Sequence, residues 1–331
     1  MSNMTVQFAG AADGAASTPD AQRALFLKVF SGEVITAFES NTVTLDKHNV
    51  RTIQNGKSAQ FPVLGRLTPA AYHTPGTQLT GGTHKHNERV INVDSLLVKD
   101  IFIADIDDAM SHFDVRGKYA SQMGKLLADT FDYHIMQNLI LAARDTATIS
   151  GSPDAGKVIK NVKLASAVDA ERLKAWIDAM YAAAVELDNK SVIGPRYCLL
   201  RPEDYRFLAK AVAENGFSVL HRDYGVSGGS FSQGEIPAIA GIQPIMTPNL
   251  PKTNTSAKAA GTVDQFHGMD ASNTMGIVFT PDAVGTVKLM DLSVQSEWKI
   301  EFQGTLLVAR YAMGHGVLQP ECAVELSKAT V

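Results

Sequence analysis

The sequence predicts an α+β fold, because helical and strand periodicities are both clear and occupy separate stretches of the chain. Apolar residues recur at every third or fourth position from Val115 to Ala142, which predicts one long helix. β-branched residues with partial alternation predict strands over Val284–Glu297 and Thr305–Tyr311. The chain has 331 residues, of which 45% are apolar and 19% charged, so we expect a globular protein with about two domains.

The first forty residues divide into a polar tail and an apolar arm. Residues Met1–Asp20 are rich in Ala, Gly, Ser and Thr and offer little to bury, so we expect a mobile tail. The stretch Ala24–Phe38 is apolar, and Leu25 and Val29 recur at helical spacing. We therefore expect an arm with helical character.

A basic segment follows over Arg51–Val90. It contains five basic residues and one acidic residue, a net charge of +4: Arg51, Lys57, Arg66, Lys85 and Arg89 against Glu88. Three prolines confine a strand here to an edge, and the pair Gly81-Gly82 is typical of a turn. We expect a long β-hairpin, which is only marginally stable in water and must lie on other structure.

The next segment, Ile91–Val115, has the opposite charge. Its six aspartates, among them Asp105, Asp107 and Asp108, stand against Lys99 alone, a net charge of −5. The run Val98–Ile106 is apolar and β-branched, which predicts a strand. Asp114 then precedes the long helix as its expected N-cap.

The remaining elements follow from local patterns. We expect a helix over Asp169–Asp188 and a shorter one over Pro202–Val212, where proline occupies the first helical position. The glycine-rich stretch Ser218–Glu235 is expected to be a loop, and Leu250–Val263 to be weakly ordered. Further strands are expected at Arg196–Leu200, Gly241–Met246, Ile277–Thr280 and Cys322–Leu326.

Composition also excludes several classes of protein. No apolar run approaches the ~18 residues of a membrane span, and we expect no signal peptide. The two isolated cysteines, Cys198 and Cys322, predict neither a disulfide framework nor a zinc site and fit a reducing cytoplasm. A protein whose main task is to bind phosphates would carry a basic excess, whereas the formal net charge is −4.

Two short motifs match enzyme signatures only in part. Gly151–Lys157 fits the first seven positions of a phosphate-binding loop, but Val158 replaces the Ser or Thr that would hold magnesium. Gly225–Gly229 fits the G-x-S-x-G pattern of a nucleophile elbow, but a glycine- and serine-rich stretch follows where a helix is needed. We interpret both as turns or loops rather than as catalytic sites.

Other candidate sites have simpler structural explanations. His73, His84 and His86 lie near a glycine turn with no Cys or Asp to complete a metal shell. The aspartates before the long helix are favoured by the helix dipole, which explains them without acid–base catalysis. His315 lies between two glycines and is expected in a turn. The sequence therefore predicts no enzyme, no catalytic residue, no metal and no cofactor.

Several longer segments resemble the major capsid proteins of the T7-like, short-tailed phages of the Autographiviridae. They occur in the same order as in that family: ALFLKVF at 24–30, GEVITAF at 32–38, GKSAQFPVLGR at 56–66, DIDDAMSHFDVR at 105–116, AVGTVKLMDL at 283–292 and RYAMGHG at 310–316. This chain has Arg310 where the family usually has Lys. The first twenty residues and the expected hairpin tip, Gly76–Asn87, do not match.

The resemblance implies an HK97-like capsid fold with named parts. These are a tail and N-terminal arm over 1–50, an E-loop hairpin over 51–90, a P-domain with the long spine helix over 91–192, an A-domain over 193–283, and returning strands over 284–331. It also implies hexamers and pentamers that enclose double-stranded DNA in an icosahedral head. An HK97-fold shell protein of a cellular nanocompartment is the alternative.

The resemblance further implies partners and a location. The partners are further copies of the chain, a scaffolding protein, the portal or connector, and packaged double-stranded DNA bound without sequence specificity; no membrane is involved. The chain would be made in the cytoplasm of the bacterial host and end in the virion capsid.

The two charge blocks predict a subunit interface in such a shell. We expect Lys57, Arg66, Lys85 and Arg89 to face the acidic residues of a neighbour's 91–115 segment, including Asp105, Asp107 and Asp108. Phe26, Phe30 and Phe61 are the expected apolar anchors between subunits, since aromatic residues dominate interface energies. The alternative is that these rings pack within their own chain.

Overall fold

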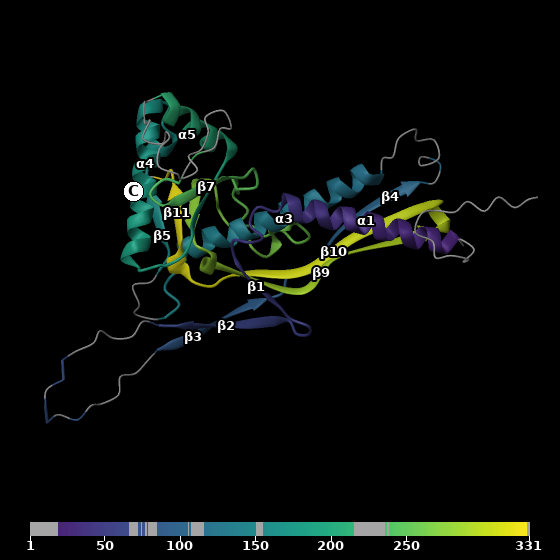
Figure 1. Cartoon of the computed structure of the whole chain (residues 1–331), viewed down its shortest axis with the longest axis horizontal. Helices are drawn as coiled ribbons and strands as arrows, with labels where there is room; N and C mark the ends of the chain where they lie inside the picture. The colour runs from purple at the N-terminus through teal and green to yellow at the C-terminus, as the bar shows by residue number, and fades with distance from the viewer. Residues whose placement is uncertain are drawn as a thin grey trace, which may run out of the picture. The chain divides into compact units, whose positions relative to one another are not determined.

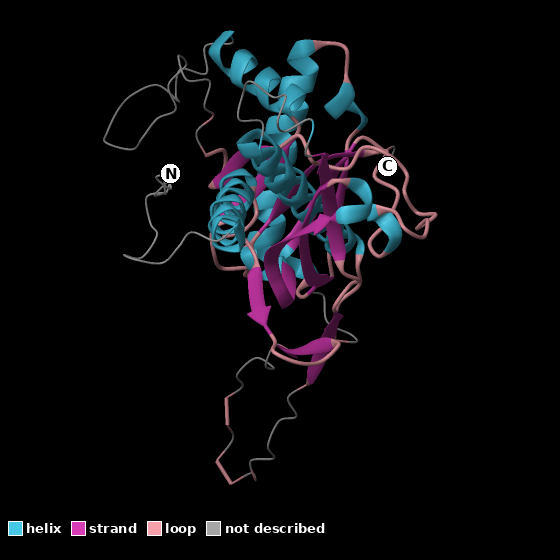
Figure 2. Cartoon of the chain, turned by 90° about the vertical axis from the view of Figure 1, so that its right-hand side faces the viewer, coloured by secondary structure: helices cyan, strands magenta, loops and turns pink. Residues whose placement is uncertain are grey.

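A computed structural model describes residues 19–65, 72–73, 75–76, 78, 85–104, 106, 116–149, 155–214, 236 and 238–329. The chain forms two compact units. Unit 1 comprises Met1–Thr42, Ser95–Asp129 and Met290–Ala312, and unit 2 comprises Val43–Asp94, Thr130–Leu289 and Met313–Val331. Each unit contains helices and strands, so the predicted α+β class is confirmed. Figure 2 shows the helices in cyan and the strands in magenta.

Unit 1 is built on a close helix pair. Helix α1, Pro19–Asn41, buries Phe30, Val34 and Phe38 at four-residue intervals along one face. At the crossing, a Cβ on Gly124 of α3 would lie 2.5 Å from the carbonyl oxygen of Val34. Only glycine allows the two backbones to approach this closely. The expected helical arm is therefore confirmed and extends to residue 41.

Helix α3, Arg116–Arg144, confirms the long helix expected over 115–142. Its 29 residues correspond to about 43 Å at 1.5 Å per residue. Residues up to Asp129 belong to unit 1, and those from Thr130 onward belong to unit 2. In unit 2 most of the helix is buried, and the buried residues include the polar Asp132, Gln137 and Asn138 as well as apolar ones.

Unit 1 also contains an antiparallel strand pair. Strand β4, Leu97–Ala104, pairs with the first part of β10, Gly304–Val317, from Ala104↔Gly304 to Leu97↔Tyr311. The burial of β10 alternates here, with Leu307 and Ala309 fully buried. One face of this pair therefore points into unit 1 and the other points outward.

Unit 2 contains a five-stranded mixed sheet in the order β5-β11-β8-β6-β7. The strands are β5 Lys157–Lys160, β11 Ala323–Ser327, β8 Thr274–Phe279, β6 Arg196–Leu200 and β7 Ile242–Met246. Helix α4, Asp169–Asn189, packs against β5, and helix α5, Pro202–Glu214, packs against β7 (Figure 1). Their shared core centres on the fully buried Trp176.

Two long strands, β9 Val284–Lys299 and β10, lie side by side, and β1, Asn49–Thr52, pairs in parallel with β9. The prediction for His315 is wrong, because this residue lies buried within β10 rather than in a turn. Its flanking glycines serve close packing instead. A Cβ on Gly314 would overlap the carbonyl oxygen of Asn92, and one on Gly316 would crowd Ile91.

The expected hairpin is confirmed as β2, Ser58–Leu64, paired antiparallel with β3, His86–Asn92. Its base contributes Ala59 and Ile91 to a small apolar cluster with Val287 and Leu318 of the same unit. The base of the hairpin therefore packs on its own chain. The predicted turn at Gly81-Gly82 lies outside the described residues.

Short 3₁₀ helices complete the fold. They are η1 Val162–Ala165, η3 Val263–Gln265, η4 Pro281–Ala283, η5 Ile300–Phe302 and η6 Pro320–Cys322. Among the helices that the structure describes, none is long and apolar enough to cross a membrane. The division into arm, E-loop, P-domain and A-domain remains a prediction, because those names refer to positions in a shell.

Candidate subunit interface

The structure places only part of the predicted interface. Lys57, Phe61, Lys85 and Arg89 lie on or beside the β2–β3 hairpin of unit 2, and Phe30 lies in α1 of unit 1. The side chain of Phe26 and the whole of Arg66, Asp105, Asp107 and Asp108 lie outside the described residues. The hairpin is therefore the part of the predicted interface whose geometry can be examined.

Phe61 lies on the hairpin face that packs against the small apolar cluster of its own chain, and Arg51 covers part of its ring. Its half-buried ring belongs to β2, directly opposite Arg89 of β3. The guanidinium carbon of Arg51 lies 5.8 Å from the centre of the Phe61 ring, within cation–π range. Arg51 Nη1 also donates a hydrogen bond to the carbonyl oxygen of Gln60 at 2.7 Å. Phe61 is thus partly covered and keeps some surface for a partner.

Arg89 is engaged within its own chain. Its Nη2 lies 2.7 Å from Asp145 Oδ2, and its Nε donates to Thr148 Oγ1 at 3.2 Å. Asn87 donates a further hydrogen bond to the carbonyl oxygen of Thr148 at 2.8 Å. These contacts fasten β3 to the segment after α3. Less of the Arg89 charge is therefore available to a neighbouring subunit than the sequence alone would indicate.

Lys57 and Lys85 have exposed side chains on the hairpin. Their backbones are fixed by hydrogen bonds between the two arms of the hairpin. The carbonyl oxygen of Lys57 accepts from the amide of Val93 at 2.8 Å, and that of Lys85 accepts from the amide of Gly65 at 3.0 Å. Lys57 thus presents a basic side chain at the surface of the hairpin, as contact with an acidic surface requires. That contact between subunits stays a prediction.

Phe30 is located inside unit 1. It is 1% exposed, in the helix face that α1 buries. A side chain this deeply buried has no area to offer another subunit, so its placement agrees with the alternative of packing within its own chain.

An exposed apolar surface in unit 1 is a candidate that the sequence reasoning missed. Val98 and Phe102 share the outward face of β4 and are 47% and 45% exposed, and Ile300 and Phe302 of η5 are 69% and 67% exposed. The rings of Phe102 and Phe302 meet edge to face, with their centres 6.2 Å apart. We call Val98, Phe102, Ile300 and Phe302 the outer apolar patch.

The geometry of the turn between β9 and β10, which contains η5, explains how this patch forms. Gln303, which follows η5, adopts a left-handed conformation with φ 49°, and Gly304 then begins β10. A Cβ on Gly304 would overlap the ring of Phe102, so glycine lets that ring lie against the strand. The sequence signal for the β4 part of the patch is that apolar residues occupy both faces of this strand, whereas the contact of Phe102 with Phe302 is tertiary.

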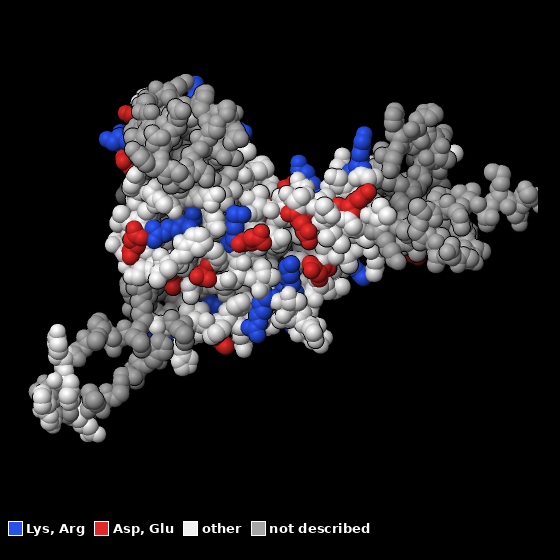
Figure 3. All heavy atoms as spheres, viewed as in Figure 1, with Lys and Arg blue, Asp and Glu red and all other residues white. Residues whose placement is uncertain are grey.

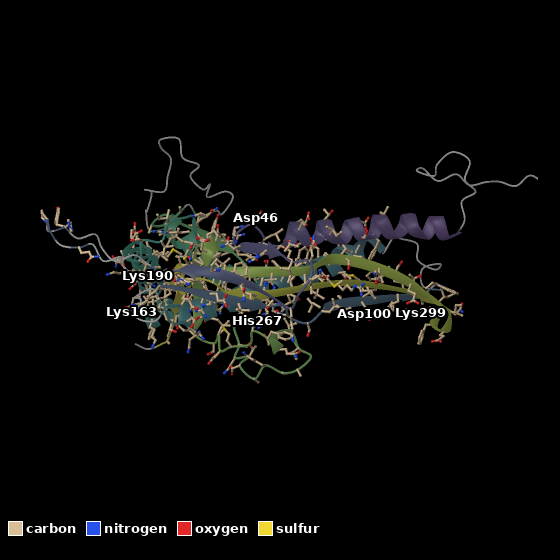
Figure 4. The ribbon with its side chains drawn as sticks, turned by 90° about the horizontal axis from the view of Figure 1, so that it is seen from below. Asp46, Asp100, Lys163, Lys190, His267 and Lys299 are labelled. Atoms are coloured by element: carbon tan, nitrogen blue, oxygen red, sulfur yellow. The ribbon has the colours of Figure 1, made fainter. Side chains whose placement is uncertain are left out.

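Charges near the patch are mixed in sign. Asp100 lies on the outward face of β4 between Val98 and Phe102, and Lys299 precedes η5; both are labelled in Figure 4. Across the face drawn in Figure 3, basic and acidic side chains are interspersed rather than gathered by sign. Asp100 and Lys299 thus give the patch charged neighbours of both signs, as in the polar rim of protein interfaces.

The two cysteine thiols are not activated as nucleophiles. Both cysteines are buried, and burial raises the pKa of the Cys322 thiol to about 12 and that of Cys198 still further. Within the described ranges, no group of three or more His, Cys, Asp or Glu residues is arranged to hold a metal. The G-x-S-x-G motif and the first four residues of the phosphate-loop match lie outside those ranges.

Comparison with known sequences identifies relatives over most of the chain. Residues 60–327 match the family model described as Gp10A-like major capsid protein. The chain is 36% identical to the major capsid protein of Escherichia phage T7 over 321 residues, covering 91% of this chain and 90% of that protein.

Solved structures give the same result. A chain of the capsid of cyanophage P-SCSP1u superposes with a TM-score of 0.73 and 39% identity, covering 86% of this chain and 88% of that one. A chain of the mature capsid of bacteriophage PhiM1 superposes with a TM-score of 0.69 at 17% identity, covering 87% of each, and so shares the fold. These neighbours are HK97-like phage capsids, which confirms the predicted HK97-like fold. The chain belongs to the Gp10A-like family of phage major capsid proteins.

Proposed function

We propose that this chain assembles as hexamers and pentamers into an icosahedral phage head that encloses double-stranded DNA. The observation that carries the proposal is the match to phage major capsid proteins along nearly the full length of both chains. The family model alone spans residues 60–327, which include strand β3 of the hairpin and most of unit 2, and this extent supports the proposal.

The outer apolar patch supports contact between copies of the chain. Soluble monomers rarely leave contiguous aromatic and branched side chains exposed, and such surfaces mark interaction sites. Phe102 and Phe302 already meet ring edge to ring face, so a partner would bind a preformed surface with little loss of side-chain entropy. We infer that this patch is buried against another subunit in the shell.

The charged hairpin supplies a second contact in this proposal. Lys57, Arg66 and Lys85 would face the acidic segment 91–115 of a neighbour, and Phe61 would add apolar area. Arg89 contributes less, because Asp145 of the same chain neutralises it. Each exposed ion pair is worth only ~0–1 kcal/mol, but a shell repeats the contact in every subunit.

The partners follow from the same role. We propose that a scaffolding protein guides assembly, that a portal or connector occupies one vertex, and that packaged DNA is held without sequence specificity. The chain has no enzymatic activity in this account and no membrane partner. It is made in the cytoplasm of the host bacterium and ends in the virion.

Electron microscopy of the full chain, expressed with and without its scaffolding protein, tests the proposal. We expect closed shells of uniform size with scaffolding protein present. Absence of shells, rings or capsomers under all conditions would refute it. Shells that enclose a cargo peptide and form without any scaffolding protein would instead identify a cellular nanocompartment.

A charge-exchange series tests the hairpin contact separately. Arg66→Glu and Asp108→Arg each place like charges together in the proposed interface, and the double variant restores opposite charges. We expect each single variant to assemble poorly and the double variant to recover. Normal assembly of both single variants would eliminate this contact while leaving the capsid role intact.

A further inference from the structure

Four buried histidines of unit 2 lie at the base of the hairpin segment, residues 43–94. His134 comes from α3, His267 from the loop after η3, and His315 from β10; His48 directly precedes β1. All four are 8% exposed or less. Buried histidines are uncommon enough to need an explanation, and neither catalysis nor a metal supplies one among the described residues.

Three of these rings form a compact triangle. The ring centres of His134 and His267 are 5.5 Å apart, those of His134 and His315 are 5.8 Å apart, and those of His267 and His315 are 6.0 Å apart. Phe131 joins the triangle to His48, with its ring 5.1 Å from His315 and 5.8 Å from His48. We call the four histidines the histidine cluster.

The hydrogen bonds of His134, His315 and His48 are to uncharged groups, as expected for neutral imidazole rings. His134 Nε2 lies 2.9 Å from the carbonyl oxygen of Val263, and His315 Nδ1 lies 2.9 Å from the Thr286 hydroxyl. His48 Nδ1 lies 2.7 Å from the carbonyl oxygen of Thr44, while its buried Nε2 has no partner among the described residues. Among the described residues, none of these three rings has a hydrogen bond to a carboxylate.

His267 differs from the others. Its Nε2 lies 2.8 Å from Asp94 Oδ2, so a proton on this ring has a counter-ion. His267 is labelled in Figure 4. Other charged groups that act on the cluster are Asp264 towards His134, and Asp46 and Lys288 towards His48. The carboxylate of Asp132 in α3 accepts hydrogen bonds from the amides of Val43 and Thr44 and from the Thr44 hydroxyl.

The cluster joins the two ends of the hairpin segment to the core. His48 and Thr44 stand at its entry, and Asp94 stands at its exit. The carboxylate of Asp132 accepts hydrogen bonds from the backbone amides of Val43 and Thr44 at 2.9 and 3.1 Å. At the exit, the backbone amide of Asp94 donates a hydrogen bond to the carbonyl oxygen of Met313 at 3.2 Å. We call residues 43–48 and 93–94 the hairpin root.

We propose that protonation of the histidine cluster by acid releases the hairpin root from the core of unit 2. Among the described contacts only His267 has a counter-ion, Asp94, so a proton on His134, His315 or His48 would be buried with no carboxylate in contact. Within the triangle, that charge would also lie 5.5 to 6.0 Å from the neighbouring ring centres. Opening of the root exposes the rings to water, where each binds a proton at its ordinary pKa.

The pKa shifts agree in direction with this geometry. Burial lowers the pKa of His134 and lowers that of His315 well below its usual value, and the neighbouring histidines lower the His315 pKa further. Burial also lowers the pKa of His48 to about 4. Because the open form binds more protons than the closed form, opening becomes more favourable as pH falls below 6.5.

Hydrogen exchange of the full chain between pH 7 and pH 4.5, corrected for the intrinsic rate, tests this inference. The amides of Val43, Thr44 and Asp94 report the root, and those of β6 and β8 report the core of the unit. We expect root protection to fall by at least tenfold per pH unit below pH 6 and to be lost while β6 and β8, which the same protons also weaken, still retain protection. Root amides that stay as protected as those of β6 and β8 at pH 4.5, or no loss in the root, would overturn the inference.

Variants make the test specific to the cluster. His315→Gln can keep a hydrogen bond to Thr286 without a group that titrates, and His134→Gln is a second choice if the first does not fold. Either should flatten the pH dependence of root protection. His86→Gln is the matched control, since His86 is exposed on β3. A cluster variant that retains the wild-type pH profile would contradict the inference, as would a control that loses it.

Discussion

The two units use apolar side chains for different purposes. Unit 2 encloses them in a core around Trp176, where α4 and α5 cover a five-stranded sheet. Unit 1 buries one face of its helices and of the β4–β10 pair but leaves Phe102 and Phe302 at its surface. We infer from this difference that the core around Trp176 is stable within one chain, whereas the outer apolar patch of unit 1, like the hairpin of unit 2, is available to meet another chain.

Replacing one aromatic residue in each unit should reveal the difference between the units most strongly. Trp176→Ala removes a fully buried ring from unit 2, and we expect it to lower the free energy of unfolding by about 3–5 kcal/mol. Phe302→Ala should lower it by less than about 0.5 kcal/mol, because this ring is mostly exposed. Urea-induced unfolding measures both changes. Equal effects of the two variants would contradict the distinction between the units.

An ion pair in the core of unit 2 gives the next largest effect. Arg144 Nε and Nη2 each lie 2.6 Å from a carboxylate oxygen of Glu325, which is fully buried, and Thr274 also donates to that carboxylate. Arg144→Met leaves this charge buried without its ionic partner, so we expect a loss of roughly 3 kcal/mol. Adding Glu325→Gln should recover much of that loss. A double variant no more stable than the single one would refute this explanation.

Acid should weaken unit 2 through His48. The pKa of His48 is about 4 in the folded protein and 6.5 when the ring is in water, so the unfolded chain binds the proton first as pH falls. The stability is fully present above pH 6.5 and declines towards pH 4, by roughly 3 kcal/mol for this one residue. Urea unfolding at pH 7, 5.5 and 4 measures the slope. His48→Gln should have a shallower slope than wild type, and exposed His86→Gln should not.

The smallest effect is expected at the Arg89–Asp145 pair on the hairpin. Both side chains are about one-third exposed, so we expect a coupling energy of only ~0–1 kcal/mol in a double-mutant cycle of Arg89→Ala and Asp145→Ala. A coupling energy well above 1 kcal/mol would mean that the hairpin is held by charge more than by its apolar base.

Elements with strong local signals were predictable from the sequence. The long helix was expected over 115–142 and spans Arg116–Arg144, and β6 has the bounds that its apolar run indicates. β10 was expected to end at Tyr311 but continues to Val317. The glycines after Tyr311 were interpreted as a turn, because the close approach of Asn92 and Ile91 that requires them is a tertiary contact.

The interface was predictable only in part, because its charges and apolar residues depend on distant partners. Arg89 looked available from local sequence, yet its partner Asp145 lies 56 residues away. Phe30 looked like an anchor but fits the buried face of α1. The outer apolar patch arises where β4 meets the turn between β9 and β10, and no local pattern brings Phe102 and Phe302 together.

Labelling of a thiol placed in the outer apolar patch tests most directly whether unit 1 is built to contact another copy. The chain has only Cys198 and Cys322, both buried, so Ile300→Cys introduces a single exposed reporter. Free subunits should react readily with a maleimide, assembled shells should react at least tenfold more slowly, and denatured shells should react completely. Equal rates in subunits and shells would contradict the account.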